Sequence, residues 1–401
     1  MTQAARWTTL VMASALAWAG AANAQQDKPL RIGFVTDMSG IYSDLDGPNG
    51  LEAIRMAVTD AGGSVLGRKI EVVYADHQSK ADIASTKARE MFDVHGVSLL
   101  VGGTNTAANL AMNKIVAEKK KVFITVGGTS PRLTGAECTP YTIAYLFDTA
   151  ALARSTGAAV TKNGGSSWYF LTADYTFGHS LEAETAAVVK ANGGDVRGSV
   201  RHPLNAADFS AFLLTAQGSK AKVLGLANAG GDVVNSIKSA REFGLTKTMS
   251  LAALLMFIND VHALGLNATQ GLMMTDAWYW DLNPQTRQFA SRFFEKAKKM
   301  PNSIQAADYS AVSNYLKAVK QAGTDDPDRV MATFKSMKLN DLFGSGYVRA
   351  DGRYVHDLYL FQAKTPAEST RAWDYMKIVS TIPGEQAFTL PPEAERCAIT
   401  R

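Results

Sequence analysis

Short apolar runs alternate with helical segments of roughly 10–15 residues through the first two thirds of the chain. The first run is Leu30–Thr36, and the helical segment after it is Gly47–Asp60. In that segment Leu51, Ile54 and Val58 recur at helical spacing. Parallel strands need crossover helices between them, and strands buried on both faces are continuously apolar. The pattern therefore predicts an α/β fold with parallel sheets.

The alternation restarts near residue 149, and the chain's 401 residues suit about two domains. The expected strands are 30–36, 70–74, 97–101, 122–126, 167–171, 196–200, 222–227, 346–349, 358–362 and 375–379. The expected helices are 47–60, 82–94, 106–118, 149–162, 178–191, 207–216, 232–243, 284–299, 306–322 and 327–337. The late strands are too few for a third domain, so we expect them to extend the existing sheets.

This order predicts two doubly wound parallel-sheet lobes joined by a multi-strand hinge. Lobe 1 is expected to comprise 25–143 and 275–355. Lobe 2 is expected to comprise 144–274 and 356–401. The chain then crosses between the lobes near 144, 275 and 356. Multiple crossings form a natural hinge, and the cleft between the lobes becomes the expected ligand site.

The first 24 residues have the pattern of a secretory signal peptide. Arg6 supplies a positive charge, and Trp7–Ala19 is mostly apolar. Ala22–Ala24 fits the small-residue cleavage rule, which predicts cleavage after Ala24 and export. The alternative is an N-terminal membrane anchor, for which the apolar stretch is too short.

Export changes how the two cysteines are interpreted. Cys138 and Cys397 form an even pair in an oxidising compartment, so a disulfide between them is the preferred interpretation. It would tie the C-terminus to the first third of the chain. The alternative is two buried free thiols.

Composition and motifs exclude several functions. Hydrophobic residues make up 46% and charged residues 19%, which is an ordinary globular balance. The formal net charge is only +4, and the densest basic run is Lys119–Lys121, so no nucleic-acid partner is expected. The sequence has no G-x-S-x-G, Walker A or H-E-x-x-H motif, and its six histidines are scattered. We therefore expect no catalytic residues, no cofactor and no metal.

Candidate ligand-binding residues follow the predicted strands, where ligands bind in open parallel sheets. Two neighbouring loops, Thr104–Thr106 and Thr129–Ser130, are rich in hydroxyls and lie beside glycines. Hydroxyls and free N–H groups at a helix start bind anions such as carboxylates, although the same residue types are also ordinary N-caps. Aromatic residues after other strands could form the walls for an apolar ligand or pack as ordinary surface. The candidates are Ser39, Tyr42, Thr104, Asn105, Thr106, Gly128, Thr129, Ser130, Tyr175, Phe177, Asn228 and Asp232.

Short segments along the whole chain after residue 24 match one family. They are Ile32–Phe34 with Ser39–Gly40, Gly50–Ala53, Leu66–Ile70, Val101–Gly103, Thr129–Thr134, Asp174–Gly178 and Ala240–Leu245. In their order and spacing the chain resembles the periplasmic solute-binding proteins of ABC importers, of the type I fold and the leucine/isoleucine/valine-binding group. The resemblance implies a monomeric clamshell that closes on one small solute and delivers it to an inner-membrane permease.

The resemblance also assigns roles within the site. Thr104–Thr106 and Thr129 correspond to the loops that hold the ligand carboxylate. Phe177 lies where relatives often have Tyr, and Asp232 lies where amino-acid binders place the acidic partner of the ligand ammonium. Amino-acid binders have Tyr-Gly-Gly before that acidic residue, whereas this chain has Asn228–Gly231.

That loop, together with Ala277–Asp281, is more similar to the branch that binds benzoate-type and hydroxycinnamate-type acids. In that branch Asp232 or Asn228 would accept a phenolic hydroxyl. The preferred ligand is therefore an aromatic or similar apolar carboxylic acid, and a branched-chain amino acid is the alternative. A ligand sensor and, more remotely, an exported enzyme are further alternatives.

Overall fold

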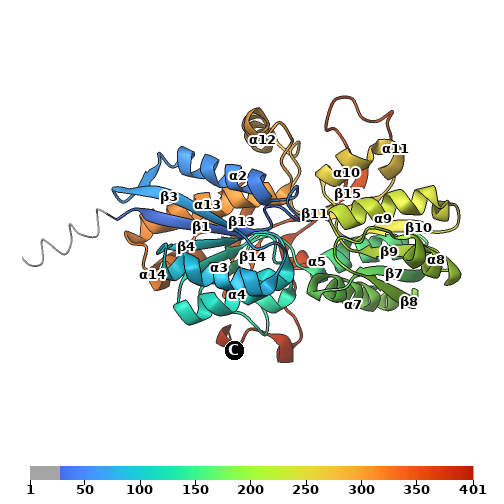
Figure 1. The fold of residues 1–401 in the computed structure, drawn as a ribbon, viewed down its shortest axis with the longest axis horizontal. Coiled ribbons are helices and arrows are strands. Elements are labelled where there is room, and N and C mark those ends of the chain that lie inside the picture. Colours follow the sequence, from blue (N-terminus) through green and yellow to red (C-terminus); the bar gives the residue numbers. More distant parts are fainter. Residues whose placement is uncertain (1–27, 401) are drawn as a thin grey trace, which may run out of the picture.

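The computed structural model describes residues 28–400, which form two α/β lobes side by side along the long axis of the molecule (Figure 1). Lobe 1 is built on a six-stranded sheet and lobe 2 on a four-stranded sheet. The predicted signal peptide, residues 1–24, lies outside the described residues. Among residues 28–400, no helix is long and apolar enough to cross a membrane.

The sheet of lobe 1 has the strand order β2-β3-β1-β4-β5-β6, and all its neighbouring pairs except β2–β3 are parallel. Its strands are β1 (Leu30–Thr36), β2 (Ser64–Val65), β3 (Arg68–Asp76), β4 (Leu99–Gly102), β5 (Val122–Thr125) and β6 (Thr142–Ala144). Every residue of β4, β5 and β6 is buried, because helices cover both faces of the sheet.

The helices of lobe 1 pack in pairs. On one side α3 (Ala81–Asp93) packs on α4 (Thr106–Lys119), and on the other α2 (Gly47–Asp60) packs on α13 (Ser303–Ala322) (Figure 1). Two further helices, α12 (Pro284–Ala297) and α14 (Pro327–Ser336), pack against these pairs. The helical block after residue 284 therefore completes lobe 1.

Lobe 2 has the parallel strand order β10-β9-β7-β8. Its strands are β7 (Ser167–Ala173), β8 (Asp195–His202), β9 (Val223–Ala227) and β10 (Ser250–Ala253). Its helices are α7 (Thr176–Ala191), α8 (Ser210–Gly218), α9 (Gly231–Glu242), α10 (Ile258–Leu264) and α11 (Leu266–Thr269). The predicted helix 149–162 is helical throughout, but a π-helical stretch at Ala153–Gly157 separates α5 (Thr149–Leu152) from α6 (Ala158–Lys162).

The late strands form two small antiparallel sheets, and the expectation that they extend the large sheets is met only by a single parallel bridge, Ala144–Arg353, at the edge of the lobe 1 sheet. One sheet has the order β11-β15-β16 and the other β12-β13-β14. Their bounds are β11 (Met273–Asp276), β12 (Lys338–Asp341), β13 (Gly344–Val348), β14 (Tyr354–Val355), β15 (Leu358–Ala363) and β16 (Met376–Ile382). Three of these strands, β11, β12 and β14, have no clear apolar run, so the sequence does not predict them. They pair antiparallel with the predicted strands β15 and β13, which produces the two separate small sheets.

We propose that the chain crosses between the lobes between β6 and α5, between β11 and α12, and between β14 and β15, with lobe boundaries near 144, 275 and 356 as the sequence predicts. A buried ion pair joins the first and third crossings, because Nη2 of Arg353 lies 3.0 Å from Oδ2 of Asp148. The same guanidinium donates to the carbonyl oxygen of Leu146.

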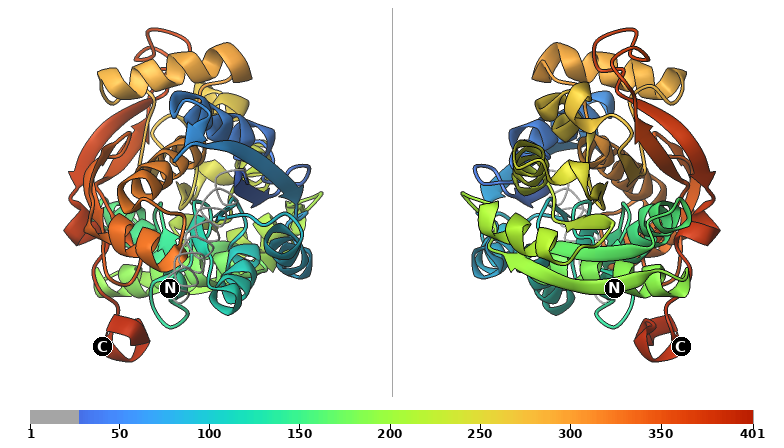
Figure 2. Two further views of the ribbon diagram at one scale, coloured as in Figure 1. Left: turned by 90° about the vertical axis from the view of Figure 1, so that its left-hand side faces the viewer. Right: turned by 90° about the vertical axis from the view of Figure 1, so that its right-hand side faces the viewer.

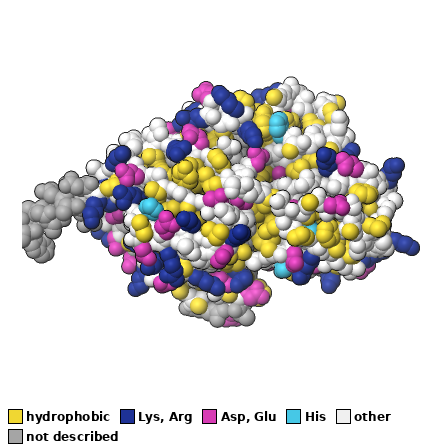
Figure 3. All heavy atoms as spheres, viewed as in Figure 1, with side chains coloured by type: hydrophobic (Ala, Val, Ile, Leu, Met, Phe, Trp, Pro, Cys, Tyr) yellow, Lys and Arg dark blue, Asp and Glu magenta, His cyan; other side chains and the backbone are white. Residues whose placement is uncertain are grey.

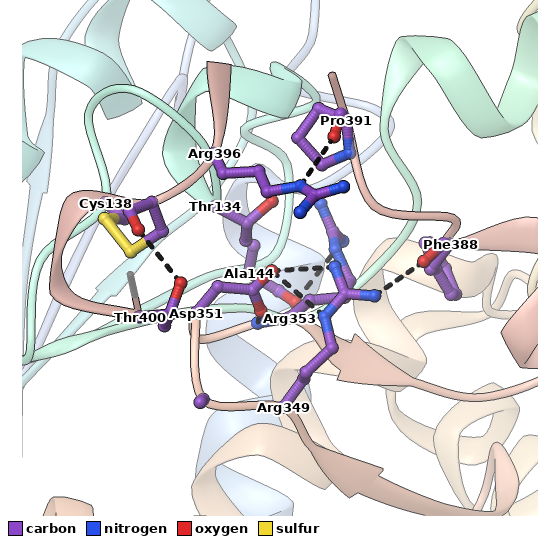
Figure 4. Close-up of polar contacts among 12 residues, drawn as sticks. Thr134, Cys138, Ala144, Arg349, Asp351, Arg353, Phe388, Pro391, Arg396 and Thr400 are labelled. Carbon is purple, nitrogen blue, oxygen red and sulfur yellow. Dashed lines mark hydrogen bonds and ion pairs between the residues drawn. A yellow bond between two sulfur atoms is a disulfide. The ribbon is translucent and has the colours of Figure 1, made fainter. Parts of the chain in front are cut away.

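The C-terminal segment departs from the expected assignment of 356–401 to lobe 2. After β16 the chain forms α15 (Gly384–Ala387) and then joins lobe 1, where Cys397 forms a disulfide with Cys138 (Figure 4). Nη1 of Arg349 donates to the carbonyl oxygen of Phe388 at 2.6 Å. In both views of Figure 2 the red C-terminal strands run along one side of the molecule. The tail therefore makes a fourth crossing.

Basic and acidic side chains are interspersed over the face shown in Figure 3. At the densest basic run of the sequence, Nζ of Lys119 pairs with Oδ1 of Asp93 at 2.8 Å. On the same two helices Arg89 pairs with Glu118 at 2.7 Å. These pairs offset part of the positive charge at the end of α4.

Candidate functional site

A cavity lies between the lobes, at the carboxyl ends of the strands of both parallel sheets. The space between its lining atoms, open solvent included, is about 380 Å³. The lining residues are Tyr42, Leu45, Thr104, Asn105, Thr106, Val126, Gly127, Thr129, Phe147, Tyr175, Phe177, Ala229, Leu255, Phe257 and Ile304. Loops that follow β1, β4, β5, β7, β9 and β10 converge here, which is where open parallel sheets bind ligands.

The polar wall of the cavity comes from lobe 1. Oγ1 of Thr106 lies 2.9 Å from Oγ1 of Thr129, and it accepts the Thr129 N–H at 3.3 Å. Asn105 caps α4, because its Oδ1 accepts the Ala108 N–H at 3.0 Å. The other N–H groups of the first turn of α4 have no acceptor within the helix, and they form the positive end of the helix dipole. This wall can therefore hold an anion without a cationic side chain.

The apolar wall surrounds the polar one with aromatic and aliphatic side chains. Phe177 begins α7 in lobe 2, and Phe257 precedes α10. Phe147 lies on the first crossing between the lobes, and its ring centroid is 6.4 Å from that of Phe257. Each of these three rings is at most 2% exposed. A flat or branched apolar group would be enclosed on several sides.

Two tyrosines join the lobes across the cavity. The hydroxyl oxygens of Tyr42 in lobe 1 and Tyr175 in lobe 2 lie 2.7 Å apart. Beside them, Gly230 of lobe 2 lies so close to lobe 1 that a Cβ there would be 3.0 Å from Cδ1 of Tyr42. Burial raises the pKa of both tyrosines, so both remain protonated at neutral pH. The structure thus has the lobes in direct contact.

Asp232 is buried behind this wall and does not line the cavity. Its Oδ2 accepts the Asn205 N–H at 3.1 Å, and its Oδ1 has no partner among the described residues. Burial raises the pKa of Asp232 to about 6. Asn228 is also buried, and its Nδ2 lies 3.0 Å from Nε2 of His202 and 2.9 Å from Oγ of Ser236. Both predicted residues serve the packing of lobe 2 in this conformation.

Three other predicted residues lie outside the lining. Oγ of Ser39 is exposed and donates to Oδ2 of Asp76 at 2.6 Å. Gly128 faces inward, and its N–H donates to Oγ1 of Thr125 at 3.0 Å. Oγ of Ser130 accepts the Arg132 N–H at 3.3 Å and caps a short 3-10 turn. These are local structural roles, so the polar loop contributes Gly127 and Thr129 to the cavity instead.

Seven of the twelve candidates line the cavity, and their part in binding stays a prediction. They are Tyr42, Thr104, Asn105, Thr106, Thr129, Tyr175 and Phe177. The sequence reasoning missed the apolar members of the lining: Leu45, Val126, Phe147, Ala229, Leu255, Phe257 and Ile304. Recognition of β10 as a strand would have pointed to Leu255 and Phe257, which follow its end.

A largely apolar cavity shared by two α/β lobes, with a wall of hydroxyls and backbone N–H groups on one side, is typical of a clamshell solute-binding protein. The family model described as periplasmic binding protein matches residues 29–370. The chain therefore belongs to the periplasmic binding protein family, and its fold is the type I fold of the leucine/branched-chain amino acid-binding group. Members of this family are ligand-binding transport proteins and not enzymes, which confirms the prediction that the chain is no enzyme.

Solved structures support this placement. A periplasmic binding protein from Burkholderia mallei is 62% identical, with a TM-score of 0.91 over 93% of this chain and 100% of that one. A branched chain amino acid ABC transporter periplasmic ligand-binding protein from Burkholderia xenovorans LB400 is 37% identical, with a TM-score of 0.81 over 93% and 100%. A solute-binding protein from R. palustris in complex with benzoate is 21% identical and shares the fold, with a TM-score of 0.82 over 92% and 99%.

Proposed function

We propose that this extracytoplasmic protein captures a small aromatic or similar apolar carboxylic acid in the cavity between its lobes. The carboxylate docks on the hydroxyls and first-turn amides around Thr106 and Thr129. The apolar body lies among Phe147, Phe177 and Phe257. Closure then completes the cage, and the loaded protein delivers the solute to an ABC permease in the inner membrane. Export precedes this step, with signal-peptide cleavage after Ala24.

The observation that carries the ligand class is the absence of any charged side chain among the described residues that line the cavity. An amino acid brings an ammonium group, and a buried ammonium needs an anionic partner. The nearest candidate, Asp232, lies outside the lining. The polar groups opposite the carboxylate wall are the neutral hydroxyls of Tyr42 and Tyr175, which suit a phenol or a purely apolar ring.

A branched-chain amino acid is the second candidate. The relative from Burkholderia xenovorans, 37% identical, is described as part of a branched-chain amino acid transporter. The unpartnered Oδ1 of Asp232 is an acceptor that an ammonium group could reach if the Tyr42–Tyr175 pair separated. The two candidates share the carboxylate wall and differ only at the opposite end of the cavity.

A thermal-shift panel on protein unfolded and refolded to remove carried ligand separates the candidates. Benzoate, 4-hydroxybenzoate and 3-phenylpropionate are compared with leucine, valine and phenylalanine. A ligand at 100 times its Kd adds about 2.7 kcal/mol to the stability. The informative pair is 3-phenylpropionate and phenylalanine, which differ by the ammonium group.

The two proposals predict opposite results for Asp232→Asn. If the ligand is an aromatic acid, the acids shift the melting temperature, the amino acids do not, and Asp232→Asn retains binding. If leucine or valine shifts it instead and Asp232→Asn loses that shift, the amino-acid function holds. A panel in which no carboxylate binds would overturn both.

A further inference from the structure

Two buried carboxyl groups meet directly behind the polar wall of the cavity. Asp46 precedes α2 and Asp308 lies on α13, and both are fully buried. A Cβ on Gly50 would lie 2.0 Å from Oδ1 of Asp46 and 2.6 Å from Oδ2 of Asp308, so both oxygens point at one spot that only glycine leaves open. The pKa of Asp308 is raised by burial and by the nearby carboxyl of Asp46. No cation among the described residues acts on Asp308.

Two ionised carboxylates in such a site repel each other strongly, so the pair favours one shared proton and loses it only as the pH rises. Oδ1 of Asp46 and both oxygens of Asp308 have no other hydrogen-bond partner among the described residues. One shared proton satisfies two of these three oxygens. Burial raises the pKa of Asp308 well above its usual range, and burial raises the pKa of Asp46 to about 6.

The pair is connected to the ligand wall through Thr104. Oδ2 of Asp46 accepts the Thr104 N–H at 3.0 Å and the Oγ1 hydroxyl of Thr36 at 2.5 Å. Thr104 itself lines the cavity. A Cβ on Gly103 would lie 1.9 Å from Oδ2 of Asp46, so the close approach of the carboxyl to the loop needs glycine at 103. Asp46 is therefore a positioning residue for the start of the anion-binding loop.

We propose that the Asp46–Asp308 pair holds one shared proton in the solute-bound protein and thereby couples carboxylate binding to proton uptake. This inference rests on the proposed function only in placing a solute carboxylate on the Thr104–Thr106 wall. A solute carboxylate is repelled by a doubly ionised pair behind that wall and is tolerated by a singly ionised one. Binding therefore favours the protonated pair, and affinity falls as pH rises and the proton is lost.

The other titratable groups around the pair do not supply the same response. His77 lies 3.0 Å from the carbonyl oxygen of Thr104 through Nε2, and burial lowers its pKa, so it is neutral above pH 6.5. The carboxyl of Asp37 accepts N–H groups of Gly40 and Tyr42 and the hydroxyl of Ser79. Simple carboxylic acids such as benzoate are fully ionised above about pH 6 and do not titrate between pH 6.5 and 9. Leucine also carries an ammonium group that begins to titrate towards the upper end of this range, so with leucine the comparison of wild type and Asp308→Asn assigns the response.

Titration calorimetry with the carboxylate that binds in the panel, benzoate or leucine, tests the proposal. Measurement at pH 7 in phosphate and in Tris, which differ in ionisation enthalpy, counts the protons taken up. We expect a fractional uptake of up to one proton and a Kd that rises from pH 6.5 to 9, by at most tenfold per pH unit. Asp308→Asn keeps a donor for Asp46 and should remove both the uptake and the slope.

The matched control is Asp276→Asn. Asp276 is also buried, with a pKa that burial raises to about 7, but it lies on β11 outside the cavity lining. Its replacement should leave the uptake and the slope as in the wild type. Should Asp308→Asn fail to fold, the wild-type uptake alone still decides. Tight carboxylate binding without proton uptake overturns the proposal and leaves the proposed function standing, whereas binding of only neutral or cationic solutes overturns both.

Discussion

Replacement of Gly230 by alanine is expected to weaken solute binding through a contact that exists only when the lobes are together. Gly230 precedes α9 with φ 59° and ψ −135°, a conformation that other residues rarely adopt. The resulting strain, about 1–3 kcal/mol, acts in the open and the closed protein alike. The new Cβ would also lie 3.0 Å from Cδ1 of Tyr42 and 3.2 Å from the carbonyl oxygen of Ile41, both in lobe 1.

The contact with lobe 1 determines the change in affinity, because it exists only in the closed protein, whereas the backbone strain is the same in the open and closed forms. Carbon atoms pack at about 3.5–4.0 Å, so closure must move lobe 1 by several tenths of an ångström. Overpacking of this kind costs about 1–3 kcal/mol, which corresponds to roughly a 5- to 150-fold rise in Kd. Calorimetry with benzoate or leucine, whichever binds in the panel, measures the Kd, and scanning calorimetry of the ligand-free protein measures the stability.

The matched control is Gly244→Ala at the other end of α9. Gly244 has φ 70°, and a Cβ there meets only the flexible side chain of Lys247, at 3.9 Å. This variant should lose stability without losing affinity. If Gly230→Ala binds as tightly as the wild type, the bound state does not bring Ile41 and Tyr42 onto Gly230, and the reasoning is refuted.

Three further predictions follow from contacts described above. Thr129→Val should weaken carboxylate binding by about 1–3 kcal/mol in calorimetry, because the anion loses a hydrogen-bond donor. The control variant Thr134→Val, on the same loop but outside the cavity, should bind as the wild type does. An unchanged affinity in Thr129→Val would remove Thr129 from the site. Unfolded, unreduced protein should titrate with no free thiol, and Cys397→Ser should cost about 2–5 kcal/mol in urea unfolding; two titratable thiols would reject the disulfide in solution. Burial raises the pKa of Asp276 to about 7 and of Asp260 to about 8, so the folded protein keeps protons that the unfolded chain releases above about pH 4. Stability should therefore fall as pH rises from about 4 to about 8, with a smaller fall in Asp260→Asn, and a stability that rises across this window would contradict the assignment.

Local patterns were sufficient to predict seven of the ten strands in the two large sheets, and they missed β2, β6 and β10. Strands such as Val122–Thr125 and Val223–Ala227 are short apolar runs between helices, and their burial on both faces follows from that composition. Ser250–Ala253 opens a longer apolar run that continues to Ile258, so composition does not separate this strand from the segment after it, and Met273–Asp276 is only four residues long. Their extended conformation depends on neighbours far along the chain, so periodicity could not identify them.

The same division holds for the site. The hydroxyl loops lie directly after strand ends, so position in the sequence was enough to predict Thr106 and Thr129 in the cavity lining. Phe147 and Ile304 come from a crossing and a helix start, which only the tertiary fold brings to the cavity. Asp232 follows the right strand, but its side chain turns into lobe 2 to accept the Asn205 N–H, and sequence position does not determine a side-chain direction.

The C-terminal segment has a consequence for the order of events during export. The disulfide joins positions 259 residues apart, and all of lobe 2 lies between them. Cys397 follows the sheets of both lobes along the chain, so both lobes can be largely assembled before the bond forms. Oxidation is therefore a late step that cross-links lobes already built, and a chain that lacks Cys397 would keep both sheets without the cross-link. Oxidised and reduced chains would then differ in their resistance to unfolding before any solute is bound.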